Sequence, residues 1–346
     1  MYSSTPLVSI IITCFNYADY INQCIESALA QTYSAKEVIV VDDGSGDQSW
    51  DRILEYGDLV ISKRTHHQGS IGCCFAGLSL ARGDFVYFLD ADDVLLPNAL
   101  NELAPYFRPE VSKIQFMLSP IDRAGTVVGE PFPRLLASEH SLPLIQSITE
   151  RGYYSTPPTS GNIYRRDVYD DLGDLSYEKG IDGVSYLLAP FLGNVVSIEK
   201  ALGQYRMHNT NLSGFSALTT ERMTGDAKRF TERLRHLQEL IEARGVQQSI
   251  EIRSEYAYVL EMNLFGAVTS GQRPTPALVL RYLRAVWREN SDSIRRASYL
   301  ALAAGLMVLP DAGRRNLVRF RVDPSRTGHV RRGLKRMLSA GRQASY

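Results

Sequence analysis

The sequence predicts an α/β fold with a mixed, mostly parallel sheet, followed by a helical C-terminal region. Three apolar runs over 8–13, 37–41 and 85–89, the first two rich in β-branched residues, are typical of buried parallel strands. Helical spacing between these runs, with short connections, predicts right-handed strand–helix–strand units. From residue 219 onward, apolar residues recur at helical spacing on a charged background, which predicts a change of architecture.

The N-terminal elements follow in order. The first strand leads into a helix that we expect to begin near Asp19. The second strand precedes a weaker strand over 59–62. A helix with several glycines, over 69–81, connects to the strand that ends at residue 89. These units place three strand ends at one edge of the sheet.

The later elements are less regular. The pattern predicts a helix over 94–107 and strands over 114–118 and 125–128. The stretch 129–162 is rich in proline and turn residues and is expected to be a loop that contacts a ligand, together with the C-terminal helices. An apolar helical pattern follows Asp182. Further helices are predicted over 219–241, 249–269, 276–289 and 292–308.

Length and charge bound the organisation of the chain. The 346 residues suffice for one domain over 1–216 and a helical region over 217–346. Lysines and arginines balance aspartates and glutamates at 38 each, yet residues 311–346 carry ten basic and two acidic residues. That tail therefore has a net charge of +8 and the rest of the chain −8. The asymmetry predicts a tail that binds an anionic partner, the alternative being a solvated tail.

The cysteines indicate a reducing compartment, and the hydropathy gives no sign of a membrane span. The four cysteines show neither metal-ligand spacing nor a disulfide framework, so buried free thiols are expected at Cys14, Cys24, Cys73 and Cys74. The N-terminus lacks the basic region of a signal peptide, and the apolar run over 301–310 is too short to span a bilayer. We expect a cytoplasmic protein.

The densest group of carboxylates is Asp90-Ala91-Asp92-Asp93, directly after the third strand. Hard cations such as Mg²⁺ bind a few carboxylate oxygens together with substrate phosphates. Ligands of open α/β sheets bind beyond the carboxyl ends of the strands. The group therefore predicts a site for Mn²⁺ or Mg²⁺ and a diphosphate; the alternative is an acidic turn or helix cap.

Two further strand ends carry small polar groups. Thr13 and Asn16 follow the first strand, and Asp43 follows the second. An aspartate at a strand end can accept a hydrogen bond from a base N–H, so these ends predict a base or ribose pocket. Gly69 at a helix start can let a sugar or phosphate approach the backbone, the alternative being a plain loop.

Two segments further along carry candidate polar groups. Arg206 and His208 lie in Tyr205-Arg206-Met207-His208. Arginine pairs with phosphate and imidazole binds divalent metals, although a structural histidine is the alternative. Asp182 opens a helix, where it can serve as a cap or as a partly desolvated general base.

The order and spacing of these motifs over about 1–215 resembles the inverting family-2 glycosyltransferases of bacterial surface-glycan synthesis. The resemblance implies the Rossmann-like nucleotide-diphospho-sugar transferase (GT-A) fold, with the catalytic domain over 1–216. It implies transfer of a sugar from a nucleotide-diphosphate donor to an acceptor hydroxyl, with Mn²⁺ or Mg²⁺.

The resemblance also implies roles for single residues. Thr13 and Asp43 would contact the base, Asp90 the ribose, and Asp92 the metal. The remaining nucleotide contacts would come from Asn16, Gly69 and Ala91. His208 would reach the metal or the pyrophosphate. Asp93 would assist at the metal or the donor sugar, and Arg206 would contact the donor sugar or play an auxiliary role.

Asp182 aligns with the acidic position of the catalytic base, although the residue before it is Ile181 where an acidic pair is common. A second departure is Cys73-Cys74-Phe75 in place of a family Ala-Arg-Asn, which removes an arginine that could steady the donor. One carboxylate would take the proton of the attacking hydroxyl, and attack opposite the diphosphate would invert the anomeric centre.

The expected substrates are a UDP- or dTDP-sugar and a glycan or lipid-linked acceptor of the bacterial cell envelope. The basic tail would hold the protein on the inner, anionic face of the plasma membrane. Nucleic acid is not expected, because no recognised binding motif accompanies the charge. One alternative is a sugar-1-phosphate nucleotidyltransferase. That class requires a Gly-rich, Arg-containing phosphate loop after the first strand, and 13–16 lacks one. The other alternative is a non-catalytic, membrane-associated module that binds nucleotide sugars.

Overall fold

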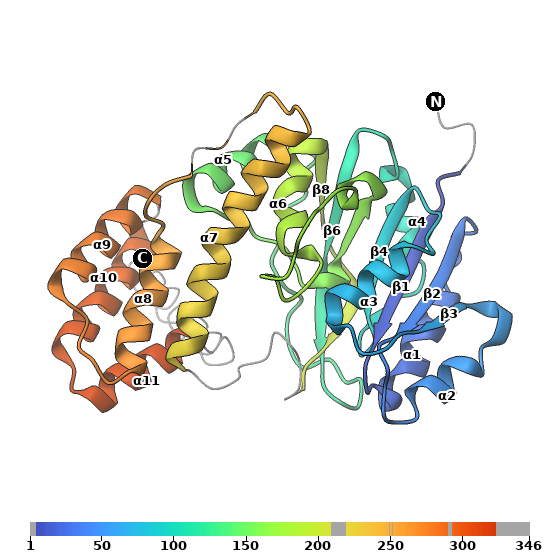
Figure 1. The fold of residues 1–346 in the computed structure, drawn as a ribbon, viewed down its shortest axis with the longest axis horizontal. Coiled ribbons are helices and arrows are strands. Elements are labelled where there is room, and N and C mark those ends of the chain that lie inside the picture. Colours follow the sequence, from blue (N-terminus) through green and yellow to red (C-terminus); the bar gives the residue numbers. More distant parts are fainter. Residues whose placement is uncertain (1–4, 209–218, 249, 251, 290–292, 323–346) are drawn as a thin grey trace, which may run out of the picture. The chain divides into compact units, whose positions relative to one another are not determined.

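The computed structural model describes residues 5–208, 219–248, 250, 252–289 and 293–322 (Figure 1). The chain divides into two compact units. The first unit comprises 1–208 with 232–252, and the second comprises 209–231 with 253–346. Helix α7 (Thr220–Ala243) contributes residues to both units. The boundary expected near residue 216 falls outside the described residues.

The first unit is built on one eight-stranded sheet with the order β3-β2-β1-β4-β7-β6-β8-β5. The neighbours β3, β2, β1 and β4 are all parallel, β7 is antiparallel to both of its neighbours, β6 and β8 are parallel, and β5 is antiparallel. This arrangement confirms the predicted mixed, mostly parallel sheet. The strands are β1 (Val8–Cys14), β2 (Lys36–Asp42), β3 (Ile61–Arg64), β4 (Phe85–Asp90), β5 (Val94–Leu95), β6 (Val111–Ile121), β7 (Asn162–Arg165) and β8 (Asn194–Arg206).

The register of the parallel strands brings three carboxyl ends level. Thr13 of β1 pairs with Asp90 of β4, and Cys14 pairs with Asp42 of β2. The strands are buried on both faces, as the apolar runs predict, since Ile10 and Ile11 point to opposite faces and both have 0% exposure. The loops that leave these three ends therefore share one edge of the sheet.

Helices cover both faces of this sheet (Figure 1). Helix α1 packs its apolar side against the face that holds Ile10. Helix α3 packs on the opposite face, where a side chain at Gly77 would come within 2.4 Å of Ile11. Glycine at that position therefore permits close helix–sheet packing. The helices of the first unit before α7 are α1 (Ala18–Leu29), α2 (Ser49–Leu54), α3 (Gly69–Leu78), α4 (Ala99–Leu103), α5 (Leu142–Arg151) and α6 (Asp182–Leu192).

The structure corrects several predicted elements. Residues 94–95 form strand β5 rather than the start of a helix, because Val94 pairs with β8 and Asn98 adopts a left-handed backbone (φ 62°) before α4. Residues 125–128 contribute one isolated bridge instead of a strand. The loop expected over 129–162 contains helix α5. Strands β7 and β8 were not predicted from the sequence.

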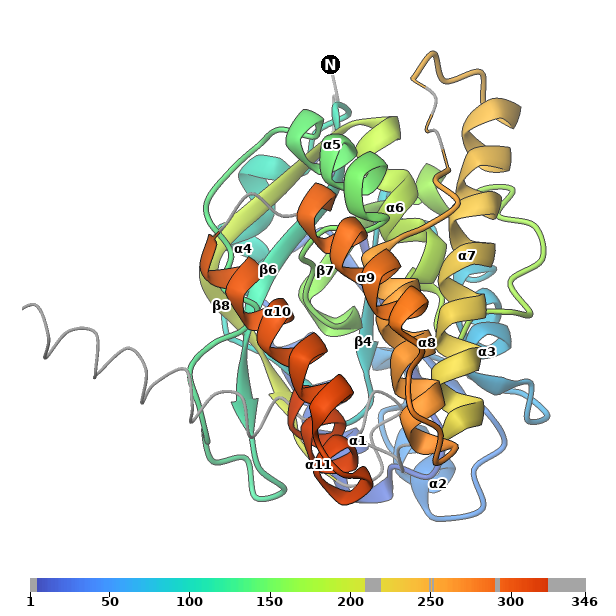
Figure 2. The same ribbon diagram turned by 90° about the vertical axis from the view of Figure 1, so that its left-hand side faces the viewer.

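The second unit is helical, as predicted. Its helices are α8 (Ala257–Thr269), α9 (Pro276–Glu289), α10 (Ser293–Val308) and α11 (Asp311–Val322), with the first part of α7. They enclose a core in which Leu264, Phe265, Tyr282 and Leu306 are fully buried. Figure 2 shows α9 and α10 side by side.

Helix α11 corrects the view of 311–346 as an unbroken basic tail. Within it, Arg314 is 6% exposed, and the Arg321 Nε lies 2.8 Å from Glu261 of α8. These arginines are part of the folded unit, while residues 323–346 lie outside the described residues. Of the helices in the described part of the chain, none combines the length and apolar character needed to cross a membrane. All four cysteines are free and buried, as expected.

Candidate active site

The acidic turn at the end of β4 is closed and nearly buried. The backbone N–H of Asp93 donates a hydrogen bond to the carbonyl of Asp90 (2.9 Å). Asp92 and Asp93 are only 6% and 1% exposed, and Ala91 is buried at 1%. The tight turn brings all three carboxylates to the sheet edge where β1 and β2 also end.

The two predicted metal ligands are in direct contact. His208 Nε2 lies 2.6 Å from the Asp92 Oδ2, and the two side chains are 1% and 7% exposed. Tyr20 of α1 stacks on the imidazole with ring centroids 5.7 Å apart, and Tyr17 meets it edge-on at 5.9 Å. These tyrosines fix the orientation of the ring and were not among the residues predicted from the sequence. Burial raises the pKa of Asp92, and the contact with His208 opposes that shift.

Arg206 supports the acidic turn through the protein itself. Its backbone N–H donates to Asp93 Oδ1 (2.8 Å) and its Nε to the carbonyl of Asp92 (2.8 Å). Its Nη2 donates to Gln23 Oε1 (2.7 Å), and the guanidinium lies 4.7 Å from the centre of the Tyr20 ring. Because Arg206 is 1% exposed, the structure places it behind the turn, where its hydrogen bonds orient Asp92 and Asp93.

The buried carboxylates create a negative potential when they ionise, and His208 and Arg206 compensate it only in part. Burial, followed by the charges of Asp92 and Asp182, raises the pKa of Asp90 to about 8. Burial, followed by the charges of Asp92 and Asp90, raises the pKa of Asp93 well above its ordinary value. Asp93 Oδ2 is buried without a hydrogen-bond partner. This potential and the orphaned oxygen fit a divalent cation.

The donor set is that of an open site rather than a cage. Within the described ranges, no cluster of three or more His, Cys, Asp or Glu side chains is arranged to hold a metal. One carboxylate and one imidazole, Asp92 and His208, are in contact. Mg²⁺ commonly takes one or two protein ligands and completes its shell with water and phosphate oxygens.

On the neighbouring strand, Asp43 and Gly69 are brought together by a hydrogen bond. Asp43 Oδ2 accepts from the Gly69 N–H (2.9 Å), and Oδ1 accepts from the Gln68 N–H (2.7 Å) and from Thr65 Oγ1 (2.9 Å). Gly69 has φ +77°, which favours glycine. Asp43 thus holds the 65–69 loop against the end of β2 and anchors the start of α3.

Asn16 ties the loop after β1 to the loop after β2. Its Oδ1 accepts from the Gly46 N–H (2.8 Å), and its own N–H donates to Ser45 Oγ (2.9 Å). Beside it, the Phe15 ring stacks on His67 with centroids 4.3 Å apart, and Phe15 is 40% exposed. This exposed aromatic pair at the same edge was not predicted, although Phe15 lies within the strand-end motif.

Asp182 and Asp90 are linked by one short loop, residues 156–161. Thr159 Oγ1 donates to Asp182 Oδ2 (3.2 Å), while Ser160 Oγ accepts from the Asp90 N–H (3.1 Å). The charge of Asp182 contributes to the raised pKa of Asp90, so the two carboxylates belong to one site. The loop lies in the stretch expected to bind the acceptor, but its bridging contacts were not predicted.

A buried lysine of β6 anchors the same loop to the sheet. Lys113 of β6 has 0% exposure, and its Nζ donates to Thr156 Oγ1 (2.7 Å), Gln115 Oε1 (3.0 Å) and Tyr154 OH (3.1 Å). Burial lowers its pKa well below the usual lysine value. Asn162 completes the support, because its Nδ2 donates to the carbonyls of Pro157 and Pro158 (3.1 and 2.9 Å). No motif signalled this cluster.

The start of α6, where Asp182 lies, is held by the part of α7 that belongs to the first unit. Both carboxylate oxygens of Glu178 lie 2.5 Å from the Arg233 guanidinium. A side chain at Gly183 would come within 2.3 Å of the Glu178 carboxyl, so glycine makes room for this ion pair. Tyr177 OH and His236 Nδ1, 2.9 Å apart, add a second link.

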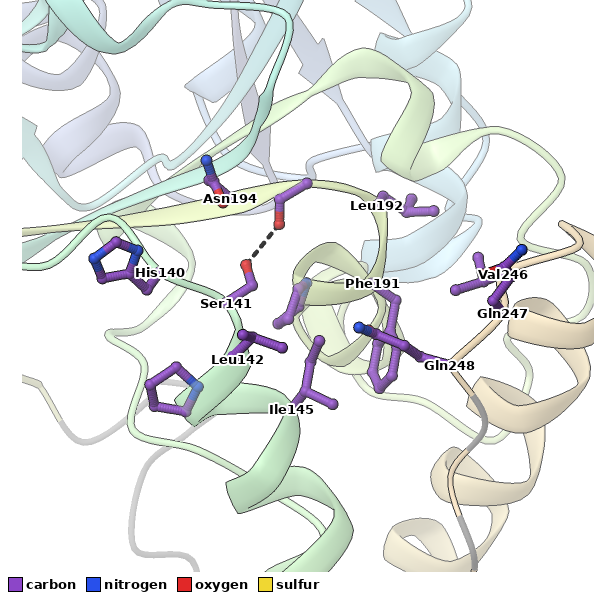
Figure 3. Close-up of a pocket in the computed structure, with 13 residues that line it drawn as sticks. His140, Ser141, Leu142, Ile145, Phe191, Leu192, Asn194, Val246, Gln247 and Gln248 are labelled. Carbon is purple, nitrogen blue, oxygen red and sulfur yellow. Dashed lines mark hydrogen bonds between the residues drawn. The ribbon is translucent and has the colours of Figure 1, made fainter.

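A separate pocket of about 750 Å³ lies beside the amino end of β8 (Figure 3). Leu142, Ile145 and Phe191 line it, and Ser141 Oγ donates to the carbonyl of Gly193 (2.6 Å). The acidic turn contacts the other end of β8, at Arg206. None of the predicted site residues lines this pocket.

Similarity to known proteins now identifies the family. Residues 9–173 match the model described as glycosyl transferase family 2. An uncharacterized glycosyltransferase of Nostoc sp. is 32% identical over 231 residues, which cover 64% of this chain and 71% of the relative. The chain belongs to glycosyltransferase family 2. Membership of this family identifies the protein as a glycosyltransferase, as predicted, and not as the sugar-1-phosphate nucleotidyltransferase of the alternative.

Other similar proteins match shorter segments or the fold alone. The Escherichia coli UDP-Glc:alpha-D-GlcNAc-diphosphoundecaprenol beta-1,3-glucosyltransferase WfaP is 36% identical over 115 residues, covering 33% of this chain and 45% of that enzyme. The solved structure of S. aureus TarS 1–349 in complex with UDP has a TM-score of 0.50 at 18% identity and covers 91% of both chains. The predicted GT-A fold is therefore confirmed.

Proposed function

We propose that this glycosyltransferase is a metal-dependent, inverting enzyme that moves a sugar from a UDP- or dTDP-sugar to a hydroxyl of a glycan or lipid-linked acceptor. The observation that carries the proposal is the convergence of Asp90, Asp92 and Asp182 at one edge of the sheet. A role in bacterial cell-surface polysaccharide synthesis is supported by the name of the Escherichia coli relative, which describes a UDP-glucose donor and a diphosphoundecaprenol-linked acceptor.

Asp92 and His208 would hold Mn²⁺ or Mg²⁺. When bound, the cation supplies positive charge that stabilises the departing nucleotide diphosphate. Arg206 keeps the Asp92–Asp93 turn in place through hydrogen bonds to both residues. Asp93, with one buried oxygen left unpaired, assists at the metal or at the donor sugar.

The nucleotide would lie over the ends of β1, β2 and β4. Asp90 faces the ribose, with Thr13 beside it in register. Asp43 contributes next to the base from the end of β2, on a loop fixed by its bonds to Gln68 and Gly69. The rest of the nucleotide site is formed by Asn16, Gly69 and Ala91.

Asp182 acts as the general base in this proposal. Thr159 orients its carboxylate, and the site leaves it able to accept the proton of the attacking hydroxyl. Attack on the anomeric carbon from the face opposite the diphosphate inverts that centre. The proton moves to Asp182 while the glycosidic bond to the diphosphate breaks.

Residues 1–216 are proposed as the catalytic domain and 217–346 as an accessory helical region. A peripheral position on the inner face of the plasma membrane would bring the enzyme to a lipid-linked acceptor. The predicted contribution of the basic tail rests mainly on residues 323–346, which lie outside the described residues.

Two matched variants test the proposal in a single experiment. Purified protein is melted with UDP, dTDP or GDP, with and without Mn²⁺, and is then assayed for donor hydrolysis and transfer across a nucleotide-sugar library. We expect Asp92→Asn to lose metal-dependent stabilisation by the nucleotide, because the cation loses its carboxylate ligand. Asp182→Asn should keep that stabilisation and lose at least a hundredfold in transfer.

Each variant is the control for the other. Absence of metal-dependent stabilisation by all three nucleotides in the wild-type protein would contradict the metal-dependent mechanism. Transfer by Asp182→Asn at the wild-type rate would assign the base to another residue.

A further inference from the structure

Helices α9 and α10 expose large apolar side chains on the surface of the second unit. Leu280 and Trp287 of α9 are 49% and 57% exposed, and Leu300 and Val308 of α10 are 44% and 79% exposed. Within each helix the two residues are seven or eight positions apart, which places them on one face. The opposite faces, with Val279 and Tyr282 on α9 and Leu302 and Leu306 on α10, supply the core.

The exposed faces adjoin each other. Helices α9 and α10 run side by side in both views (Figures 1 and 2). The guanidinium of Arg296, from α10, lies 4.4 Å from the centre of the Trp287 ring on α9, and its Nη2 donates to the Trp287 carbonyl (3.0 Å). The exposed apolar side chains therefore border a single helix pair. The name α9–α10 face is used here for these four side chains together with one exposed arginine: Leu280, Trp287, Leu300 and Val308, with Arg284.

The charge around this face is mostly positive, although Glu255, from the segment before α8, pairs with Arg281 of α9 (2.6 Å). Between 271 and 310 the sequence has six arginines and two acidic residues. One of the acids, Glu289, is 4% exposed and accepts a hydrogen bond from the Ala257 N–H (2.8 Å), while Asp292 lies outside the described residues. Arg284 lies four residues after Leu280 and three before Trp287, so an exposed cation stands between the two apolar groups.

This combination fits an anionic lipid surface. Arginines near a membrane gain about 1 kcal/mol each from anionic headgroups, and aliphatic side chains gain by entering the acyl boundary. Tryptophan favours the interface because its ring is apolar and its N–H polar. Nucleic acid would satisfy the arginines but would leave Leu280, Leu300 and Val308 in water.

We propose that the α9–α10 face docks on bilayers that contain anionic lipids. The helices would lie on the membrane rather than cross it, in keeping with their length and hydropathy. The proposal deepens the proposed function, on which its biological purpose rests, because docking would deliver the enzyme to a lipid-linked acceptor. The docking itself uses residues of the folded second unit and does not require residues 323–346.

Flotation of the full-length protein with vesicles tests this docking. The vesicles consist of phosphatidylcholine alone, or of phosphatidylcholine and phosphatidylglycerol in equal amounts. We expect binding to the anionic vesicles only, weakened by salt. Arg284→Gln should weaken it about fivefold and the double variant with Trp287→Ser about fiftyfold, since one cation and one interfacial ring are lost.

The control is a matched double variant elsewhere in the chain. Lys228→Gln with Leu59→Ser removes an exposed cation on α7 and a 69% exposed leucine in the first unit, and should bind like the wild type. A third protein, which lacks 323–346, should still bind the anionic vesicles. Its loss of vesicle binding should not include the contribution that Arg284 and Trp287 make. Thermal melts exclude misfolding in every variant.

Three outcomes would overturn the proposal. The first is that the α9–α10 double variant and the control variant bind the vesicles equally well. The second is that removal of 323–346 alone abolishes vesicle binding. The third is that, when binding to a DNA duplex is measured as well, the α9–α10 variant loses DNA binding but keeps vesicle binding. Donor hydrolysis in vesicle-free buffer separates this result from the proposed function. The α9–α10 variant should hydrolyse donor like the wild type. A failure of docking therefore does not contradict the catalytic proposal, and a failure of donor hydrolysis does not contradict docking.

Discussion

At the scale of single residues, Asp90 is a buried carboxyl group whose ionisation is unfavourable in the unliganded site. It ends β4, faces Asp92 and Asp182, and has a pKa raised to about 8 by burial and by those two charges. The protein therefore holds a carboxyl group that is costly to ionise until a cation or a hydrogen-bond donor arrives. Such a group is suited to binding a ligand that brings compensating charge.

The pH dependence of stability follows from this shift. The unfolded Asp90 ionises near 3.8 and the folded one near 8, so its stabilising protonated form is complete below pH 3.8 and is lost as the pH rises toward 8. Asp90→Asn cannot ionise. We expect its melting temperature, measured without metal or nucleotide, to exceed that of the wild type by several degrees near pH 8, with a difference that shrinks toward pH 4.

Asp58→Asn removes an exposed carboxyl group of the same unit and is the matched control. It should not show a difference that widens with pH. If Asp90→Asn behaves like Asp58→Asn, the carboxyl group of Asp90 is not desolvated in the unliganded protein.

At the scale of elements, the 156–161 loop connects the two halves of the site. It bonds to Asp90 through Ser160 and to Asp182 through Thr159, and it rests on Lys113 and Asn162. A lysine is rarely buried among neutral partners. Lys113 has Tyr154, Tyr164 and Tyr186 rings within 5.7 Å of its Nζ, which compensates part of the desolvation of a charged amine.

Replacing Lys113 by methionine tests this support. Methionine keeps the length but leaves Gln115 Oε1 without its donor, at a cost of about 1–3 kcal/mol. The lowered pKa of Lys113 gives stability that is present at high pH and lost as the pH falls from about 10.5. In urea unfolding, Lys113→Met should therefore be less stable than the wild type at high pH and approach it as the pH falls.

Lys200→Met, at an exposed lysine that pairs with Glu102, serves as the comparison and should change stability by less than about 1 kcal/mol. A deficit of Lys113→Met that is constant over the whole pH range would mean that the buried amine keeps its ordinary titration.

The sequence predicted the elements whose signal is local. Apolar runs identified β1, β2 and β4, and helical spacing identified α1, α6 and the helices from α7 to α10. Strands β7 and β8 escaped because their pairing depends on distant partners. β7 has only four residues, and the pairing of β8 with β6 contains register shifts near Phe116 and Met117.

The same distinction applies to the site. Asp90, Asp92 and Asp43 follow strands and could be selected from the sequence. Lys113, Glu178 and Arg233 could not, because their importance arises only when β6, the segment before α6 and α7 come together. A lysine in a strand or an arginine on an amphipathic helix carries no local mark of burial.

At the scale of the whole molecule, the chain separates its chemistry from its helical unit. The residues proposed for the donor site and the base all lie in the first unit, between Thr13 and His208. The second unit has its own core and its own buried polar network, in which Glu261 accepts from Tyr282 OH (2.9 Å) and pairs with Arg321 (2.8 Å).

Glu261→Gln should weaken the second unit without touching the donor site. Arg321 is 37% exposed and would lose its carboxylate partner, at a cost of roughly 1–3 kcal/mol. Calorimetry should show a lowered melting temperature, whereas titration with the best nucleotide diphosphate should give the wild-type affinity.

Glu221→Gln, at an exposed carboxylate of α7 in the same unit, should leave both quantities unchanged. A loss of nucleotide affinity in Glu261→Gln that Glu221→Gln does not share would show that the two units are thermodynamically coupled.

The four buried cysteines have a practical consequence for studying these units. Burial raises the pKa of Cys14 and of Cys73 to about 12 and that of Cys24 and Cys74 well above the ordinary value. Thiols in this state react slowly with maleimides, which attack thiolates. A cysteine introduced at an exposed position of α9 can therefore carry a fluorophore or spin label on the natural background, without first removing the native thiols.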